Sequence, residues 1–597
     1  MPSTIQLPIL GSGVSGRSRA VIAQDRQNIY LEVQSEQDKS GLVAYGTPGL
    51  NPFIDLGLDP VRGIYWYQQG NVMIVVAGNQ VYEVTNGGIS TNVGSLLTST
   101  GTVVMTDNGL QVMIVDGSYG YIYEKTTPDL PYSRASTTVT VTETLHTRVT
   151  GQSVIIDGDA SVASGTYTIT VPNTAATALV VGTEYVIASL GTSDFTLVGA
   201  TVNAVGIVFT ATGTTTGTGT CNNANTWTFT TVASGSATGD IRVLRNLRNI
   251  TSAYTGVDFP GANTVVFLDS YFIINVPDTK QFWISAQYDG FYWNPLDYAS
   301  KEAYTDDLSA VVVDNGNLVL VGYSSQEYWQ NTGAYPFPFQ RIAGSPVDVG
   351  VAARFSISKP AGRLTYLART RRGGLSVVMI ENYQPIPVST PDLDYLFTSY
   401  QSPGDAIAFS YRLNGHDFYE LNFQAEGVTW LYDATTKVWS RLTSFNDSRH
   451  YANRAIQFDY KIFVTDYRNG KIYTLDSNTY TDDGQPIIRQ LITPHFFKGD
   501  SFNKLHIYRL RLDMEQGVGL NNGQGENPQI MLQVSRDGGF TWGSEMWTSF
   551  GAQGQFLKRA EWRRLGVSRN FVFKFRISDP VKVVLIGAAA YATEAAK

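Results

Sequence analysis

Short apolar runs, each followed by a polar or glycine corner and a strand bearing Tyr or Trp, recur along the chain. The seven copies of this hairpin pattern begin at Gly70, Asn108, Asp269, Asn315, Arg372, Asn414 and Asp459. Outside one long gap, successive copies start 38 to 57 residues apart, close to the roughly 40 to 50 residues of a four-stranded propeller blade. The pattern predicts an all-β chain with a β-propeller of about six blades. Two stacked β-sandwiches made of the same hairpins are the alternative.

The gap between the second and third copies differs in composition. Residues 136–240 are dominated by Thr, Ser, Ala, Val and Gly, contain no Lys, and have Arg148 as their only Arg. Runs such as "GTYTITV" and "NTWTFTTV" alternate apolar with polar residues, as half-buried strands do. This segment is therefore predicted to be an inserted β-sandwich.

The pattern changes again after residue 492. In "NFVFKFRIS", Phe571, Phe573, Phe575 and Ile577 share one strand face, while Val572, Lys574 and Arg576 share the other. This alternation predicts a C-terminal antiparallel domain that resembles a β-sandwich. The expected domains are an N-terminal segment with the first blades (1–135), the insertion (136–240), the remaining blades (241–492) and the C-terminal β domain (493–597).

Composition narrows the classes of function. The 597 residues carry a formal net charge of −8, which argues against tight nucleic-acid binding by phosphate neutralisation, although DNA could still slide past. The single cysteine, Cys221, rules out intramolecular disulfides. With no basic, apolar leader and no run of about 18 apolar residues, the expectation is a soluble protein of a reducing compartment without a membrane span.

The segment "SRDGGFTW" carries the spacing of the Asp-box found in sialidase-like propellers. Asp537 can accept backbone N–H groups, and the glycines can adopt positive φ. The predicted role is a structural turn, whose residues are Ser535, Asp537, Gly539, Thr541 and Trp542.

No spacing assembles the arginine cluster, Tyr–Glu pair and acid of a retaining sialidase. Glu302 near Tyr304, and Asp392 near Asp394 and Tyr395, are better explained as loop or turn residues. The prediction is a non-enzyme without catalytic residues.

Cofactor and metal motifs are also missing from the sequence pattern. "GSGVSG", Gly11 to Gly16, has the letters of a dinucleotide fingerprint but neither the preceding buried strand nor the following helix. The five histidines show no metal-ligand spacing. We therefore expect no cofactor and no metal.

Two basic clusters are candidate contacts with partners or with other copies of the chain. In an acidic chain, exposed arginines can pair with acidic patches of neighbours in a ring. The candidate residues are Arg369, Arg371, Arg372, Arg563, Arg564 and Arg569.

Both ends of the chain resemble one family. The opening "IQLPIL" and "NIYLEVQSEQDKSGLVAYGTPGL", and the closing "LQVSRDGGFTWGSE" and "KRAEWRRLGVSRNFVFKFRISDPVKVVLIGAAA", are similar to the packaged-DNA stabilisation, or tail nozzle, proteins of short-tailed bacteriophages. Part of the insertion, residues 182–220, resembles a β-module that recurs in structural proteins of tailed phages.

The resemblance implies a hexameric ring in the virion tail, assembled in the host cytoplasm below the portal and its adaptor ring. Such a ring would extend the channel for double-stranded DNA, retain the packaged genome and bind a tail needle, spikes or fibres. Two alternatives remain. One is a glycan-binding or glycan-cleaving propeller, suggested by the Asp-box and by aromatics such as Trp293 and Trp329. The other is a tail fibre or receptor-binding protein.

Overall fold

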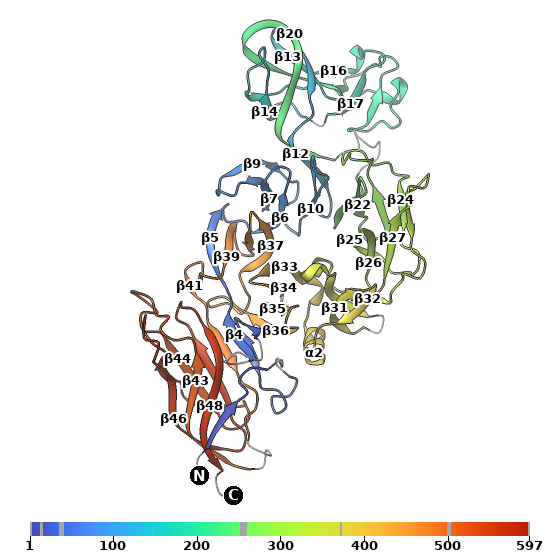
Figure 1. The fold of residues 1–597 in the computed structure, drawn as a ribbon. Helices are drawn as coiled ribbons and strands as arrows, with labels where there is room; N and C mark the ends of the chain where they lie inside the picture. The colour runs from blue at the N-terminus through green and yellow to red at the C-terminus, as the bar shows by residue number, and fades with distance from the viewer. Residues whose placement is uncertain are drawn as a thin grey trace. The chain divides into compact units, whose positions relative to one another are not determined.

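The structure is a computed structural model that describes residues 3–11, 13, 16–34, 41–146, 148–250, 259–370, 373–497 and 503–594. Strands dominate this part of the chain, and its one α-helix is α2 (Pro391–Ser399) (Figure 1). The chain divides into two compact units. The first unit comprises 1–61, 323–325 and 347–597, and the second comprises 62–322 and 326–346.

The second unit contains four antiparallel blade-like sheets. Three of them have four strands, and the second continues beyond its four blade strands into the insertion. The first two are β6 (Val61–Tyr67), β7 (Val72–Ala77), β8 (Gln80–Val84) and β9 (Ser90–Ser95), and β10 (Val104–Asp107), β11 (Gln111–Val115), β12 (Gly120–Thr126) and β20 (Thr226–Asn249). The other two are β21 (Val265–Leu268), β22 (Tyr271–Asn275), β23 (Gln281–Ile284) and β24 (Tyr298–Ser300), and β25 (Leu308–Asp314), β26 (Asn317–Gly322), β27 (Gln326–Asn331) and β28 (Phe339–Arg341).

Alternate residues of β11 pack into the cores on the two faces of its sheet, one shared with each neighbouring sheet. Val112 and Ile114 of β11 belong to a core shared with the β6–β9 sheet. Their neighbours Met113 and Val115 belong to a core shared with the β21–β24 sheet. Because successive side chains of a strand point to opposite faces, a strand buried on both faces reads as a continuous apolar run, as "QVMIV" does.

The first unit contains three more blade-like sets of four strands. The first set is a separate sheet, and the other two are parts of a nine-stranded and a six-stranded sheet. The three sets are β29 (Val349–Val351), β30 (Thr365–Thr370), β31 (Leu375–Glu381) and β32 (Gln384–Pro387); β33 (Ile407–Leu413), β34 (His416–Phe423), β35 (Val428–Asp433) and β36 (Val438–Leu442); and β37 (Ala452–Phe458), β38 (Lys461–Asp466), β39 (Lys471–Asp476) and β5 (Gly49–Asp55). The last sheet is completed by a strand from near the N-terminus, and the short strands β40 (Thr481–Asp482) and β41 (Gln485–Pro486) follow β5.

Six of the seven predicted hairpins form the two central strands of a blade-like set of four strands. The fifth hairpin forms β31 and β32, the last two strands of its set. The described residues therefore contain seven blade-like sheets, one more than the six or so expected. The number of hairpins in the sequence equals the number of these sheets. What the pattern does not show is that β5 and β20, which are remote in sequence, complete two of them.

The rest of the first unit is a β-sandwich. One sheet has the order β3 (Ile29–Val33), β4 (Leu42–Gly46), β48 (Val584–Glu594), β43 (Leu505–Met514) and β46 (Ala560–Ser568), and β1 (Ser3–Leu7) also pairs with β48. The other has the order β2 (Asp25–Gln27), β42 (Arg489–Ile492), β47 (Val572–Ile577), β44 (Gln529–Ser535) and β45 (Met546–Ser549). Because β2 also pairs in parallel with β36, these strands continue the sheet of β33 to β36.

The core of the sandwich agrees with the predicted alternation. Phe571, Phe573, Phe575 and Ile577 are all buried between the two sheets. The N-terminal strands β1, β3 and β4, which lie in the predicted domain of N-terminal segment and first blades (1–135), add to this sandwich. Their apolar residues could cover any sheet, and only the long-range pairing selects β48.

The insertion contains two small β parts in the second unit. β13 (Leu130–Thr142), β14 (Ser153–Asp157) and β15 (Gly165–Thr168) surround one core together with β20. β16 (Asn173–Ala175), β17 (Glu184–Ser189), β18 (Val208–Thr210) and β19 (Thr220–Asn223) surround another. β20 pairs with β13 along one stretch and with the blade strand β12 along the next, so the insertion is continuous with a blade. The limits 136 and 240 stay a prediction.

Candidate functional site

The Asp-box is a tight turn at the end of β44, and the Asp537 carboxylate accepts hydrogen bonds from residues of the same turn. The Asp537 carboxylate accepts hydrogen bonds from the Thr541 hydroxyl at 2.5 Å and from the Ser535 hydroxyl at 2.7 Å. It also accepts the N–H groups of Thr541 and Phe540 at 2.9 and 3.0 Å. These hydrogen bonds, those from Thr541 first, hold the pKa of Asp537 well below its usual value. An ionised carboxylate held this way stabilises the turn and is a poor general acid.

The two glycines of the turn have left-handed backbones. Gly538 and Gly539 have φ of 79° and 97°. A Cβ on Gly538 would lie 2.9 Å from the amide nitrogen of Asn570, and Asn570 is hydrogen-bonded to His495. The Lys574 ammonium lies over the Trp542 ring, 4.3 Å from the ring centroid. We interpret the Asp-box as a packed corner of the sandwich.

Two of the acidic candidates for catalysis are held by local structure. Asp392 and Asp394 lie in the first turn of α2, where carboxylates favour the helix dipole. Asp392 accepts the Arg17 guanidinium at 3.3 Å. The backbone N–H of Glu302 donates to the Glu327 carboxylate at 3.3 Å, and Glu302 itself is exposed.

The aromatics that suggested glycan binding are not exposed. Trp293 and Trp329 are buried within the second unit. The reason is that both side chains pack in the cores between neighbouring blade sheets.

Three arginines share one carboxylate on the outer face of the β1–β48–β43–β46 sheet. Glu561 of β46 lies 2.7 Å from Arg511, 2.9 Å from Arg563 and 3.8 Å from Arg509. Although burial raises the pKa of Glu561, hydrogen bonds from Arg511 and Arg563 keep it below its ordinary value. We call these three arginines and Glu561 the arginine face. One acid facing three bases leaves this surface positive.

The structure separates the predicted basic residues. Arg563 belongs to the arginine face, and Arg564 and Arg569 are exposed in and just after β46. Arg369 is exposed on β30 of a blade sheet, while Arg371 and Arg372 lie outside the described residues.

Sequence reasoning missed Arg509 and Arg511. Their spacing of two in "LHIYRLRLDME" puts them on one strand face. That spacing could have grouped them together, but only the register pairs Arg511 with Glu561 and Arg509 with Arg563.

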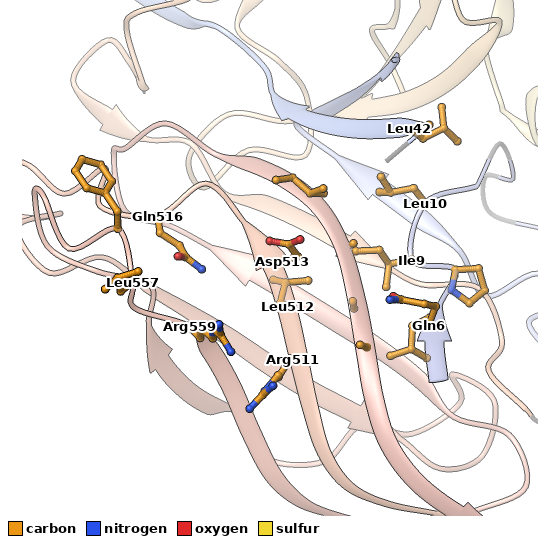
Figure 2. Close-up of a pocket in the computed structure, with 18 residues that line it drawn as sticks. Gln6, Ile9, Leu10, Leu42, Arg511, Leu512, Asp513, Gln516, Leu557 and Arg559 are labelled. Atoms are coloured by element: carbon orange, nitrogen blue, oxygen red, sulfur yellow. The ribbon is translucent and has the colours of Figure 1, made fainter. Parts of the chain in front are cut away.

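A groove of about 830 Å³ lies beside the arginine face (Figure 2). Gly587 and Ala589 of β48 contribute small residues to it, and Phe556 and Leu557 lie along it. Figure 2 shows Arg511 and Arg559 at the same end of the groove. A Cβ added to Gly587 would meet no atom within 4 Å, so the space above this glycine is open.

The described residues hold no group of three or more His, Cys, Asp or Glu placed to bind a metal ion. In the same part of the chain, no helix combines the length and apolarity needed to cross a membrane.

Comparison with protein families shows the family of this chain. The model described as "Bacteriophage P22 Gp10, beta-propeller" matches residues 189–480, and the one described as "Bacteriophage P22 Gp10, beta-sandwich" matches residues 488–593. The chain belongs to the P22 Gp10 family. It is a structural protein of a phage tail, and membership of the P22 Gp10 family points to a non-enzymatic role.

The family match confirms the all-β class, the propeller and the C-terminal sandwich. The propeller match begins within β17 of the insertion. In the first two blade-like sheets of the second unit, the strands β6 to β12 precede the matched residues, and β20 lies within them. The sandwich match covers β43 to β47 in full and all but the last residue of β48.

Other comparisons add little to the P22 Gp10 assignment. No curated protein sequence matches the chain. Among solved structures, the WD40 beta propeller domain of Doa1 is 8% identical with a TM-score of 0.30, covering 72% of this chain and 96% of Doa1's. The computationally designed Ika8 protein is 9% identical with a TM-score of 0.31, covering 71% and 99%. Dihydro-heme d1 dehydrogenase NirN is 10% identical with a TM-score of 0.32, covering 83% and 75%.

Proposed function

We propose that the chain forms a ring, a hexamer, in the phage tail, assembled in the host cytoplasm below the portal and its adaptor. The ring extends and closes the channel for double-stranded DNA, retains the packaged genome and binds a needle, spikes or fibres. The observation that carries this proposal is that a propeller and a sandwich of the P22 Gp10 family follow each other in one chain.

The physical character of the chain supports a passive channel. Paired blade sheets leave few exposed strand edges, which suits a rigid load-bearing block. A net charge of −8 favours repulsion of DNA phosphates over binding, so DNA can slide during ejection. The proposed mechanism is assembly and gating, with no bond made or broken.

The number of copies per particle tests the ring. We expect quantitative peptide mass spectrometry of purified particles to give about one copy of this chain for every two portal subunits. That ratio matches a six-fold ring beneath a twelve-fold portal. If the chain is missing from particles, or only a few copies remain after washing, the nozzle proposal fails.

We also propose that the basic candidates contact neighbouring subunits or partners. Arg563 and Arg564 are both exposed on β46, so their charges can be reversed without burying a group. We expect the double substitution Arg563→Glu and Arg564→Glu to reduce the copies per particle by on the order of tenfold, because like charges at a contact are repulsive.

The matched control for this reversal is Arg341→Glu, which changes an exposed arginine of β28 in the second unit. The control should leave the copy number unchanged. Particles of the double variant with a full complement of this chain would contradict the contact.

A further inference from the structure

The loop between β5 and β6 presents one apolar side chain between acids. Leu58 is 93% exposed, and the exposed carboxylates of Asp55 and Asp59 flank it in "DLGLDP". Asp55 accepts the N–H of Gly57 at 2.9 Å. Gly470 exchanges backbone hydrogen bonds with Leu56 and Gly57. The loop is therefore held in one shape with its leucine projecting into solvent.

The groove beside the arginine face presents the complementary features. Leu557 is 95% exposed and Phe556 is 69% exposed, so two adjacent apolar side chains lie open to water. Phe556 is held against Gly517, where a Cβ would lie 2.8 Å from its ring. Adjacent exposed apolar side chains of this kind are typical of a surface that a partner covers.

The charged residues around the groove indicate which kind of segment could cover it. Arg511 and Arg559 lie at one end of it (Figure 2), and Arg509 and Arg563 adjoin Arg511 through Glu561. The facing acids are Glu561 and Asp513. Four guanidiniums against two carboxylates leave a positive end, which favours an acidic segment with an apolar side chain.

We infer that the Asp55–Pro60 loop of one copy docks in the groove of the neighbouring copy. Leu58 packs against Phe556 and Leu557 above Gly587, and Asp59 pairs with Arg559 and Arg511. Leu58 and Leu557 are the two most exposed leucines of the described residues, and this contact covers both. The inference rests on the proposed ring and names the surfaces that would close it.

A contact between this loop and this groove joins two different surfaces of neighbouring copies. The loop and the groove are different surfaces of the same chain, so each copy offers one to each neighbour. Contacts of this head-to-tail kind close into a ring when the rotation between copies allows it.

Cross-linking in particles tests the contact. The substitutions Leu58→Cys and Leu557→Cys are made together in the full chain, and particles are treated with a short bis-maleimide. The native thiol gives little background, because Cys221 is buried and burial raises its pKa to about 11. We expect a ladder of linked chains up to the full ring from the double variant, and none from either single variant.

A charge swap provides the second test. Asp59→Arg alone and Arg559→Asp alone should each lower the copies per particle by on the order of tenfold, and the two together should restore most of the loss. Gly587→Leu should also block assembly by filling the groove, whereas Gly587→Ala should have little effect, because the site has room for a methyl group.

The outcomes separate this contact from the ring itself. Particles with a normal copy number but no cross-link, or a swap without rescue, overturn the loop-in-groove contact and leave the ring intact. Normal rings that lose another tail protein when the groove is blocked also overturn it, since the occupant is then not a second copy. Absence of the chain from wild-type particles overturns both proposals.

Discussion

Replacing Glu143 with Ala should destabilise the second unit by about 3 to 5 kcal/mol, the usual cost of breaking a buried ion pair from one side. Glu143 follows β13 and lies 2.5 Å from Arg148 and 3.0 Å from Arg248. Trp227 of β20 also donates its indole N–H to Glu143 at 2.8 Å. Without this carboxylate, the buried Arg148 guanidinium loses its counter-charge where the insertion meets the blade strands, while Arg248 keeps Glu124 at 3.1 Å.

Urea unfolding of the full chain, with hydrogen exchange followed in β13 and β20, measures this loss. The matched control is Asp129→Ala in the same unit, since Asp129 pairs with Arg242 at 2.6 Å but both side chains are about half exposed. An exposed pair contributes about 1 kcal/mol or less. Equal effects of the two variants would show that the Glu143 network contributes no more than a surface pair.

The same carboxylate should make the second unit sensitive to acid. Although burial raises the pKa of Glu143, Arg148 and Arg248 lower it to about 2. A lowered folded-state pKa contributes stability that is complete above the unfolded value of about 4.3 and is lost as the pH falls toward 2. The acid-induced loss between these pH values, about 3 kcal/mol, should be absent in Glu143→Gln.

Replacing Gly49 with Val should destabilise the first unit by about 3 kcal/mol, at the upper end for overpacking. A Cβ at Gly49 would lie 2.4 Å from the carbonyl oxygen of Thr481 and 2.6 Å from that of Thr479. Backbone atoms cannot rotate away as a side chain can. The expected result is loss of β5 from its sheet and exposure of Leu50, which is fully buried.

Urea unfolding with hydrogen exchange in β39 and β40 measures this effect. Gly374→Val is the control, because the nearest atom to its Cβ is the Thr370 hydroxyl at 3.6 Å and its φ is not positive. Its effect should stay within about 0.5 kcal/mol, as for other surface changes. Intact protection of β39 in Gly49→Val would show that β5 is not needed to complete the sheet.

The local features of the candidate sites were largely readable from the sequence. The Asp-box spacing specifies a turn, because the side chains of Ser535, Asp537 and Thr541 hydrogen-bond to one another and to backbone N–H groups of the same turn. The alternation around Phe573 identified the buried face of β47. These features depend on residues a few positions apart.

The arginine face and its groove were not readable in this way. Arg511 and Glu561 are fifty positions apart, and they meet only because β43 pairs with β46 in one register. The basic residues that follow Arg563 in the sequence have different surroundings. Lys574 lies over Trp542, and Arg576 lies beside Glu545. A count of charges along the chain cannot separate these environments.

The sequence by itself determined the all-β class, the seven hairpins and the Asp-box turn, because hydrophobic period and turn chemistry act over a few residues. Only the tertiary structure decided that β5 and β20 complete remote sheets, that β1, β3 and β4 join the C-terminal sandwich, and that three arginines share Glu561. Long-range strand pairing selects among many partners of similar apolar pattern. That choice rests on the register and packing of the whole chain, which no local pattern encodes.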